Sequence, residues 1–265
     1  MQTSTFPTTF DQAVIENEAK LEIRNVTKVF KRGRQSNRAV DDVSLKLAKN
    51  EFSCIVGPSG CGKSTLLNIA AGLVKSTSGD VLVDGEVVPG PGADRGMVFQ
   101  NYTLFPWLSV AKNIAFGLSL KGMPKAEQRQ KVAHYLDIVG LSDYANAYPK
   151  ELSGGMKQRV AIARALANDP EVLLKDEPFG ALDSQTKEQL QEFFQDLWEK
   201  SHITVFMITH DVEEAIFLSQ RVHIMNKQGQ LSETLEIGLP VHRELDMKLT
   251  PEFLEYKRHI VHALR

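Results

Sequence analysis

The segment that most constrains the fold is residues 57–65, a glycine-rich run that contains Lys63 and Ser64 and follows the apolar residues 52–56. A buried strand that ends in such a turn and continues into a helix, here predicted over residues 64–71, is the phosphate-loop arrangement of α/β proteins. Glycine lets backbone N–H groups approach a phosphate that a Cβ would keep away. The sequence therefore predicts a nucleotide site on this loop.

The residue types in the loop define separate roles. Lys63 is expected to place its ammonium group on the β- and γ-phosphates, and the Ser64 hydroxyl is expected to ligate Mg²⁺. The nucleotide-binding residues predicted here are Gly57, Pro58, Ser59, Gly60, Cys61, Gly62, Lys63, Ser64 and Thr65.

A second phosphate-binding device lies at residues 152–159, where Ser153, Gly154 and Gly155 precede a helical pattern. The exposed N–H groups of a helix start, together with the positive end of the helix dipole, make an anion site. The chain carries one copy of each device. Two chains that face each other, each lending Ser153 to the other's nucleotide, would account for both.

Two adjacent acids, Asp176 and Glu177, come one residue after the predicted buried strand 171–174, whose residues 172–174 are apolar. A buried strand that ends in acids places them at the carboxyl edge of the sheet, where ligands of such folds bind. Asp176 is expected to hold Mg²⁺ through its water shell, and Glu177 to orient and deprotonate an attacking water.

The rest of the chain predicts one α/β core with an inserted helical lobe. Strands are expected near residues 21–26, 43–47 and 203–208, a basic loop at 31–34, and a hairpin around Asp84 and Gly85. Residues 109–140 have helical periodicity. Helices between the buried strands indicate a largely parallel sheet covered on both faces.

Composition excludes several classes of protein. The 265 residues are 42% hydrophobic and 24% charged, which is typical of a globular core, and the net charge of −2 gives no basis for a nucleic-acid partner. The two cysteines, Cys54 and Cys61, favour a reducing compartment. No secretory signal and no run of about 18 apolar residues is present, so a membrane pore would be another polypeptide.

In their order from about residue 21 to 225, these motifs resemble the ATP-binding subunit of an ABC transporter. The resemblance implies a P-loop (RecA-like) core with an antiparallel β subdomain and an inserted α-helical subdomain. It divides the chain into a flexible arm (1–18), an ATPase domain (19–235, helical lobe about 101–165) and a short extension (236–265). The extension is expected to cap the core or to pack on a partner.

The resemblance also implies further site residues. His210 matches the histidine that contacts the γ-phosphate. With Glu177 and Lys63, it completes the predicted set of catalytic residues. Gln100 matches a glutamine that joins Ser64 and Asp176 on Mg²⁺ and couples the core to the helical lobe. Further cofactor contacts are implied for Phe30, which would stack on adenine, for Ser153, Gly154, Gly155 and Gln158, and for Asp183 at the dimer interface. For Phe30, the core of a small sheet is the alternative.

Segment 176–183 resembles the version of this motif found in importers, and segment 100–110 is similar to subunits of nitrate, sulfonate, taurine and bicarbonate importers. This implies uptake of a small anionic solute at the cytoplasmic face of the inner (plasma) membrane, with the chain bound peripherally. The implied partners are a second ATPase subunit (identical or a paralogue), an integral membrane permease and a solute-binding protein. The aromatic residues 102–107 would meet the permease, although core packing also accounts for some of them. An exporter subunit and a soluble ATPase of the iron–sulfur assembly type are the alternatives.

Lys175 departs from the family, which has an apolar residue before the aspartate. On a strand it would share a face with Glu177, and a cation there would lower the pKa of that carboxyl. The alternative is that its aliphatic stem packs while the ammonium reaches solvent or an acid.

Overall fold

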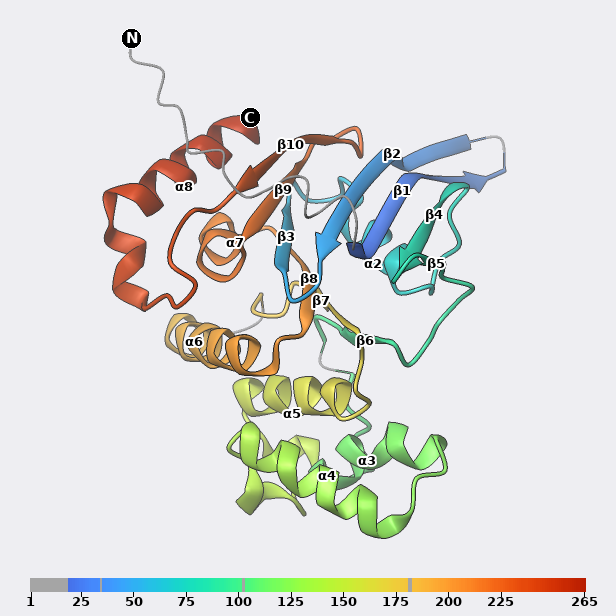
Figure 1. Ribbon diagram of the computed structural model, residues 1–265, viewed down its shortest axis with the longest axis vertical. Helices are drawn as coiled ribbons and strands as arrows, with labels where there is room; N and C mark the ends of the chain where they lie inside the picture. Colours follow the sequence, from blue (N-terminus) through green and yellow to red (C-terminus); the bar gives the residue numbers. More distant parts are fainter. Residues whose placement is uncertain (1–18, 34, 102, 181–182) are drawn as a thin grey trace.

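A computed structural model describes residues 19–33, 35–101, 103–180 and 183–265. Two sheets lie side by side above a layer of helices, which forms the lower part of the view in Figure 1. The strands are β1 (Ala19–Arg32), β2 (Gln35–Ala48), β3 (Phe52–Val56), β4 (Ser78–Val83), β5 (Glu86–Val87), β6 (Arg95–Val98), β7 (Val172–Asp176), β8 (Thr204–Thr209), β9 (Arg221–Met225) and β10 (Leu231–Glu236). The helices are α2 (Lys63–Ala70), α3 (Val110–Leu120), α4 (Lys125–Ile138), α5 (Gly154–Leu166), α6 (Ser184–Ser201), α7 (Val212–Leu218) and α8 (Pro251–Ala263), with 3₁₀ turns η1 (Ser142–Tyr144), η2 (Pro149–Glu151) and η3 (Leu245–Leu249).

The larger sheet has the strand order β10-β9-β3-β8-β7-β6. The five strands from β9 to β6 in this order run parallel to one another, and β10 at the edge runs antiparallel to β9. Every residue of β3 and β8 is buried, as expected for parallel strands covered on both faces. Because β3, β8 and β7 are adjacent, the segments that follow them emerge at one edge of the sheet.

The smaller sheet is antiparallel, with the order β2-β1-β4-β5. Its hairpin around Asp84 and Gly85 pairs Val83 with Glu86, as the sequence predicts. The basic loop expected at 31–34 is wrong in part: β1 continues to Arg32, which pairs with Gln35. At the turn, Gly33 has φ of +61°, which suits glycine.

The helical layer consists of α3, α4 and α5 around an apolar core of its own that includes Ile114, Leu136 and Val160. The buried side chain of Asn113 organises the segment before α3. Its Oδ1 accepts from the Phe105 N–H at 2.8 Å, and its Nδ2 donates to the carbonyls of Phe105 at 3.1 Å and Leu108 at 3.0 Å. These bonds fix the aromatic segment that follows Gln100.

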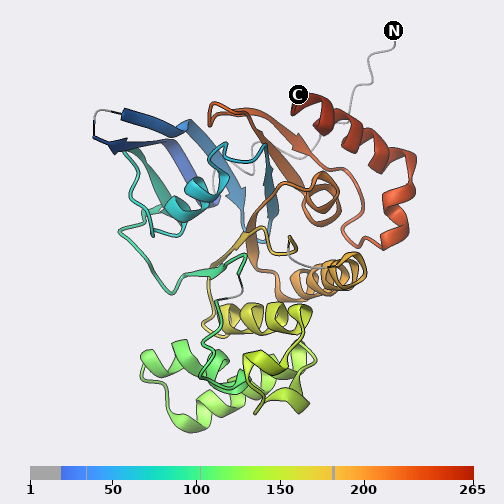
Figure 2. The ribbon, with the colours of Figure 1, turned by 180° about the vertical axis from the view of Figure 1, so that it is seen from behind.

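The C-terminal extension caps the core, the first of the two roles expected for it. Phe253 and Ile260 of α8 are fully buried in the core formed by α6, α7 and the larger sheet. Buried Arg243 donates to the carbonyls of Ile216 at 2.6 Å and Ser219 at 2.8 Å, which joins the extension to the end of α7. Figure 2 shows α8 along the outer edge of this half of the molecule. Within the described residues, no helix is long and apolar enough to cross a membrane.

Candidate nucleotide site

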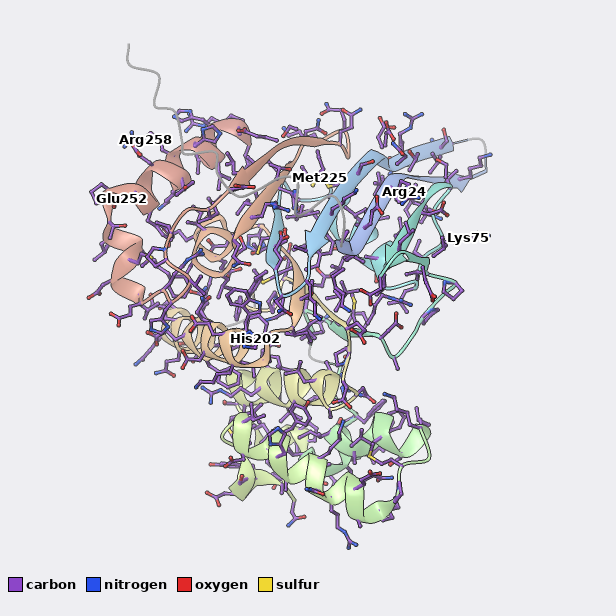
Figure 3. The ribbon with its side chains drawn as sticks, viewed as in Figure 1. Arg24, Lys75, His202, Met225, Glu252 and Arg258 are labelled. Carbon is purple, nitrogen blue, oxygen red and sulfur yellow. The ribbon has the colours of Figure 1, made fainter. Side chains whose placement is uncertain are left out.

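The phosphate loop joins the end of β3 to α2 in a conformation that depends on its glycines. Gly62 caps α2 with φ of +109°, and a Cβ there would lie 1.9 Å from the Ala39 carbonyl oxygen. A Cβ at Gly57 would lie 2.7 Å from the carbonyl oxygen of Met225, which lies in the interior in Figure 3. Larger residues at either position would displace the loop.

The Lys63 ammonium lies inside the loop, where it donates to the carbonyls of Gly57 at 2.8 Å and Pro58 at 3.0 Å. Its Nζ atom also lies 4.0 Å from the Cys61 Sγ atom, and within the described residues none of its hydrogen bonds goes to a carboxylate, so its donors can turn to an anion. The loop therefore fits the phosphates of a nucleotide.

Ser64 and Asp176 meet across the edge of the sheet, with 3.3 Å between the Ser64 Oγ and Asp176 Oδ1 atoms. Burial raises the pKa of Asp176, the Glu177 charge adds to the increase, and Ser64 and Lys63 oppose it. A hydroxyl and a carboxylate oxygen are donors that Mg²⁺ prefers, and a cation would remove the penalty of the buried carboxylate. These residues fit the cation that the sequence predicts.

Glu177 and His210 form the second contact at this edge, with 3.0 Å between the Glu177 Oε2 and His210 Nδ1 atoms. The backbone of Glu177 has φ of +39°, unusual for a residue with a side chain, and its N–H donates to the Ile208 carbonyl at 3.0 Å. Such local strain concentrates at functional sites. The strained turn directs the carboxylate toward the histidine that follows β8.

Gln100 approaches the same turn from the end of β6. Measured from an ideal Cβ built on Gly180, the Gln100 Nε2 atom lies at 3.5 Å and the His210 Cε1 atom at 3.9 Å. The structure thus places Gln100, Glu177 and His210 around Gly180, and the first of these is solvent-exposed.

Phe30 lies near the tip of the smaller sheet with 45% of its surface exposed. The Lys28 Nζ atom lies 5.0 Å from the ring centroid. The alternative that this ring forms the core of the sheet is wrong, because an exposed ring leaves a face free. Its stacking on adenine stays a prediction.

The second anion device is built as expected at the start of α5, where the Ser153 side chain caps the helix by accepting from the Met156 N–H. Gly155 is buried against α6, where a Cβ would come within 2.9 Å of the Thr186 methyl group. Gln158 is different: its side chain is fully buried, and neither amide atom has a hydrogen-bond partner in the part of the chain that the structure describes. This placement gives no support to a nucleotide contact by Gln158.

Asp183 caps α6, where its side chain accepts from the Thr186 N–H at 3.0 Å. Residues 181 and 182, which share the predicted interface segment, lie outside the described residues. The interface role of Asp183 stays a prediction.

The expectation that the Lys175 ammonium reaches solvent or an acid is wrong. The side chain is fully buried, and Nζ has no hydrogen-bond partner among the described residues. It lies 2.9 Å from the centroid of the Phe194 ring and 4.9 Å from that of Phe179. Burial lowers the pKa of Lys175 well below its usual value, against the opposing charges of Cys54 and Glu214. The lowered pKa disfavours the charged form of Lys175, which weakens the physical basis for tuning Glu177 by a cation.

Two polar connections near the site have no signal in the sequence. Arg164 of α5 donates to the Thr103 carbonyl at 2.8 Å and lies 5.5 Å from the Phe105 ring centroid, so it ties the segment after Gln100 to the helix of Ser153. Lys187 of α6 bridges Asp211 and Glu214 beside His210. Neither pairing is detectable from local spacing, because its partners lie far apart in the chain or on different elements.

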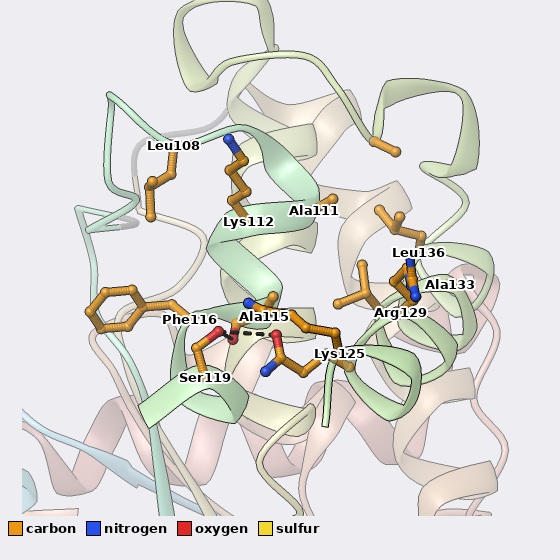
Figure 4. A pocket seen from close by; sticks show the side chains of 13 residues that line it. Leu108, Ala111, Lys112, Ala115, Phe116, Ser119, Lys125, Arg129, Ala133 and Leu136 are labelled. Carbon is orange, nitrogen blue, oxygen red and sulfur yellow. Dashed lines mark hydrogen bonds between the residues drawn. The ribbon is translucent and has the colours of Figure 1, made fainter. Parts of the chain in front are cut away.

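A groove of about 650 Å³ lies in the helical layer between α3 and α4 (Figure 4). Its apolar wall includes Val132 and Leu136, and Lys112, Lys125 and Arg129 also line it. Beside it, the Phe105 ring lies 4.4 Å from that of Phe116 and 5.7 Å from that of Trp107, which is 71% exposed. The exposure of Trp107 excludes core packing as its role.

A phosphate loop, an acidic strand end, a histidine after the neighbouring strand and a separate helical layer define an ATP-binding cassette. The chain belongs to the ABC transporter family, whose model matches residues 40–180. It is 50% identical over 252 residues to the nitrate import ATP-binding protein NrtD of Synechocystis sp., which covers 92% of this chain and 95% of that protein. It is 48% identical to the taurine import ATP-binding protein TauB of Roseobacter denitrificans, over 84% of this chain and 81% of that protein.

Solved structures agree with this assignment. The dimeric post-hydrolysis state of the ATP-binding cassette MJ0796, bound to ADP and Pi, has a TM-score of 0.73 and 36% identity. The similarity covers 83% of this chain and 100% of that one. The predicted P-loop fold with its antiparallel and helical subdomains is confirmed.

Proposed function

We propose that this chain is the ATP-hydrolysing subunit of a membrane importer and that it works as a dimer around two nucleotides. The observation that carries the proposal is the contact of Glu177 with His210 beside the Ser64–Asp176 pair, at the edge where the phosphate loop opens. Phosphoryl transfer requires positioning and charge stabilisation more than covalent chemistry, and these groups provide both.

Each residue has one task in the reaction. Lys63 and the loop N–H groups hold the β- and γ-phosphates and stabilise charge that builds on them. Glu177 accepts a proton from the attacking water as the water oxygen bonds to the γ-phosphorus. His210 holds the Glu177 carboxylate and faces the γ-phosphate. The bond to the β-phosphate oxygen then breaks, leaving ADP and inorganic phosphate.

Mg²⁺ would be held by Ser64, Asp176 and Gln100. When bound, it would neutralise charge on the phosphate oxygens. Residues of this chain do the rest: the Ser64 hydroxyl donates to Asp176 Oδ1 at 3.3 Å, which holds these two groups side by side.

The second nucleotide contact comes from a partner chain. Ser153 caps α5, which packs on α3, α4, α6 and β6, whereas α2 of the phosphate loop packs on β2, β7 and β8. The buried side chains of α5 and α2 thus lie in different hydrophobic cores, and Ser153 and Lys63 are carried by separate parts of the chain. Closure of two chains, each with Ser153 on the other's γ-phosphate, uses both devices. The dimeric cassette bound to ADP and Pi supports this arrangement.

ATP hydrolysis by the purified chain and its Glu177→Gln variant tests the reaction. We expect the variant to lose about 10²–10⁴-fold in rate because the water loses its base, while it still binds ATP. We also expect the variant to accumulate as an ATP-dependent dimer in sedimentation, since it binds nucleotide without clearing it. Equal rates in both proteins would contradict the role of Glu177.

The groove between α3 and α4 is the surface we assign to the permease. Its apolar wall suits a short amphipathic helix. Lys112, Lys125 and Arg129 make no ion pair within the described part of the chain, so they are available for acids on that helix. The docked chain would lie at the cytoplasmic face of the membrane.

Co-purification with the permease tests the groove. We expect Arg129→Glu and Trp107→Ala to lose the permease while they keep basal ATP hydrolysis, and Lys227→Glu, on the distant β9–β10 turn, to keep both. Retention of the permease by the two groove variants would exclude this surface.

The solute is proposed to be a small anion such as nitrate, bicarbonate or a sulfonate, delivered by a solute-binding protein. The nitrate, taurine and aliphatic sulfonate import ATP-binding proteins among the relatives support this class. Vesicles that contain the whole complex would show ATP-dependent uptake of one of these anions. Export in place of uptake would contradict the proposal.

A further inference from the structure

A charged cluster next to the catalytic pair joins two helices. Lys187, in the first turns of α6, places its Nζ 2.6 Å from the Asp211 Oδ2 and 2.6 Å from the Glu214 Oε1 of α7. The Lys187 side chain is 24% exposed and that of Glu214 only 3%. Removal of one partner of a buried ion pair leaves an uncompensated charge, so such clusters hold their geometry firmly.

The cluster holds both neighbours of His210. The Thr209 hydroxyl donates to the Glu214 Oε2 at 2.5 Å and accepts from the Asp211 N–H at 3.0 Å. Asp211 also caps α7 by accepting from the Glu214 N–H at 3.3 Å. The backbone on each side of His210 is therefore fixed by groups that all connect to Lys187.

Lys187 is itself anchored at the start of α6. Its N–H donates to the Asp183 carbonyl at 2.9 Å, one turn away, and Asp183 caps the helix. A displacement of this first turn moves Lys187, and with it the two carboxylates beside His210. The contact between His210 and Glu177 is the next link, at 3.0 Å.

In this cluster the carboxylates of Asp211 and Glu214 share one cation, the Lys187 ammonium. Burial raises the pKa of Glu214, while its bonds to Lys187 and Thr209 oppose the increase. For Asp211, burial acts to raise the pKa, but the hydrogen bond and charge of Lys187 outweigh it and the pKa is lowered. Without Lys187 the two carboxylates would repel each other across the segment that carries His210.

We propose that Lys187 is a positioning residue that fixes the switch segment 209–211 against the first turn of α6, so that His210 meets Glu177 in the reactive geometry. The inference rests on the proposed function only in taking ATP hydrolysis as the activity that this geometry serves. It also connects the start of α6, where Asp183 is predicted to lie at the dimer interface, to the catalytic histidine.

Four variants test the proposal in the full-length chain: Lys187→Met, Lys187→Arg, His210→Ala and the Lys187→Met/His210→Ala double variant. We expect Lys187→Met to lower kcat about 10–100-fold, because a displacement of about 1 Å costs that much, with KM for ATP unchanged within about twofold. Arg at this position keeps the charge and should restore most of the rate. In the His210→Ala background, Lys187→Met should have no further effect.

Lys257→Met is the matched control, because it removes an ion pair to the same helix α7, between Lys257 of α8 and the Glu213 side chain at 2.6 Å, and neither of these two side chains bonds to the described segment 209–211. We expect its kcat to equal that of the unmodified chain. A fully additive loss in the double variant, or an unchanged kcat in Lys187→Met, would overturn the positioning role.

A second readout does not depend on catalysis. The ¹⁵N signals of the His210 imidazole report its contact with Glu177, and we expect them to shift in Lys187→Met but not in Lys257→Met. If the chain hydrolysed no ATP, the proposed function would be wrong. The ¹⁵N signals would still test whether Lys187 positions His210, because they do not depend on hydrolysis. Identical His210 signals in both variants would overturn it.

Discussion

Replacement of Lys175 by methionine should stabilise the protein. The amine is fully buried and has no hydrogen-bond partner within residues 19–33, 35–101, 103–180 and 183–265, and a buried unsatisfied donor costs about 1–3 kcal/mol. Methionine keeps the length of the stem and places a thioether against the rings of Phe194 and Phe179, a contact worth about 0.3–1.5 kcal/mol. Loss of the contact between the amine and the Phe194 ring reduces this stabilisation by about 0.5–1 kcal/mol. The net gain in the free energy of unfolding is about 1–3 kcal/mol, and each kcal/mol should raise Tm by about 2–4 °C.

The stability gained by Lys175→Met should decrease as the pH rises. Because burial lowers the pKa of Lys175 in the folded chain below its ordinary value of 10.5, the unfolded chain binds one more proton between that lowered pKa and 10.5. The stability of the unmodified chain therefore rises with pH in this window. Methionine has no such dependence, so its advantage should shrink from pH 7 to pH 10.

Thermal unfolding at pH 7, 8, 9 and 10 measures both effects, with Lys200→Met on the exposed face of α6 as the control that leaves Tm unchanged at each pH. A lower Tm for Lys175→Met, or an advantage that stays constant to pH 10, would refute the reasoning. The same variant also tests tuning of Glu177: an unchanged ATPase rate and pH profile would exclude it.

Two further substitutions test the loop and the extension. Gly62→Ala should weaken ATP binding at least about tenfold, because its Cβ would lie 1.9 Å from the Ala39 carbonyl oxygen and a side chain at φ of +109° is strained. Gly60→Ala has open space at its Cβ, so its ATP affinity should fall less. A fluorescence titration with ATP measures both affinities. Arg243→Met should lower the free energy of unfolding by about 2–4 kcal/mol, because two buried carbonyls lose their donor; denaturant unfolding measures this, and a loss no larger than that of exposed Arg258→Met would contradict it.

The sequence predicts the core of the site well because strong local constraints coincide there. The phosphate loop requires a buried strand before it and a helix after it, and these are found at β3 and α2. The acids after β7 and the histidine after β8 then meet, because parallel neighbouring strands end at one edge. Ser153 caps a helix as its residue type favours.

What the sequence does not predict depends on contacts between distant segments. The burial of Lys175 under the Phe194 ring follows from how α6 packs on the sheet, and no periodicity reports that. Gln158 has the spacing of its motif, yet its amide faces the interior. The pairing of Lys187 with Asp211 and Glu214 joins two helices across β8. Local spacing fixes neighbours on one element, whereas these pairs depend on the tertiary arrangement.

The most direct test of the central claim is a pull-down of the tagged Glu177→Gln chain from gently solubilised native membranes in the presence of ATP and Mg²⁺, with the partners identified by mass spectrometry. We predict recovery of a multi-span permease, a second ATPase chain and a solute-binding protein whose ligand is a small anion. Recovery of soluble partners alone would contradict the importer assignment and favour a soluble ATPase of the iron–sulfur assembly type.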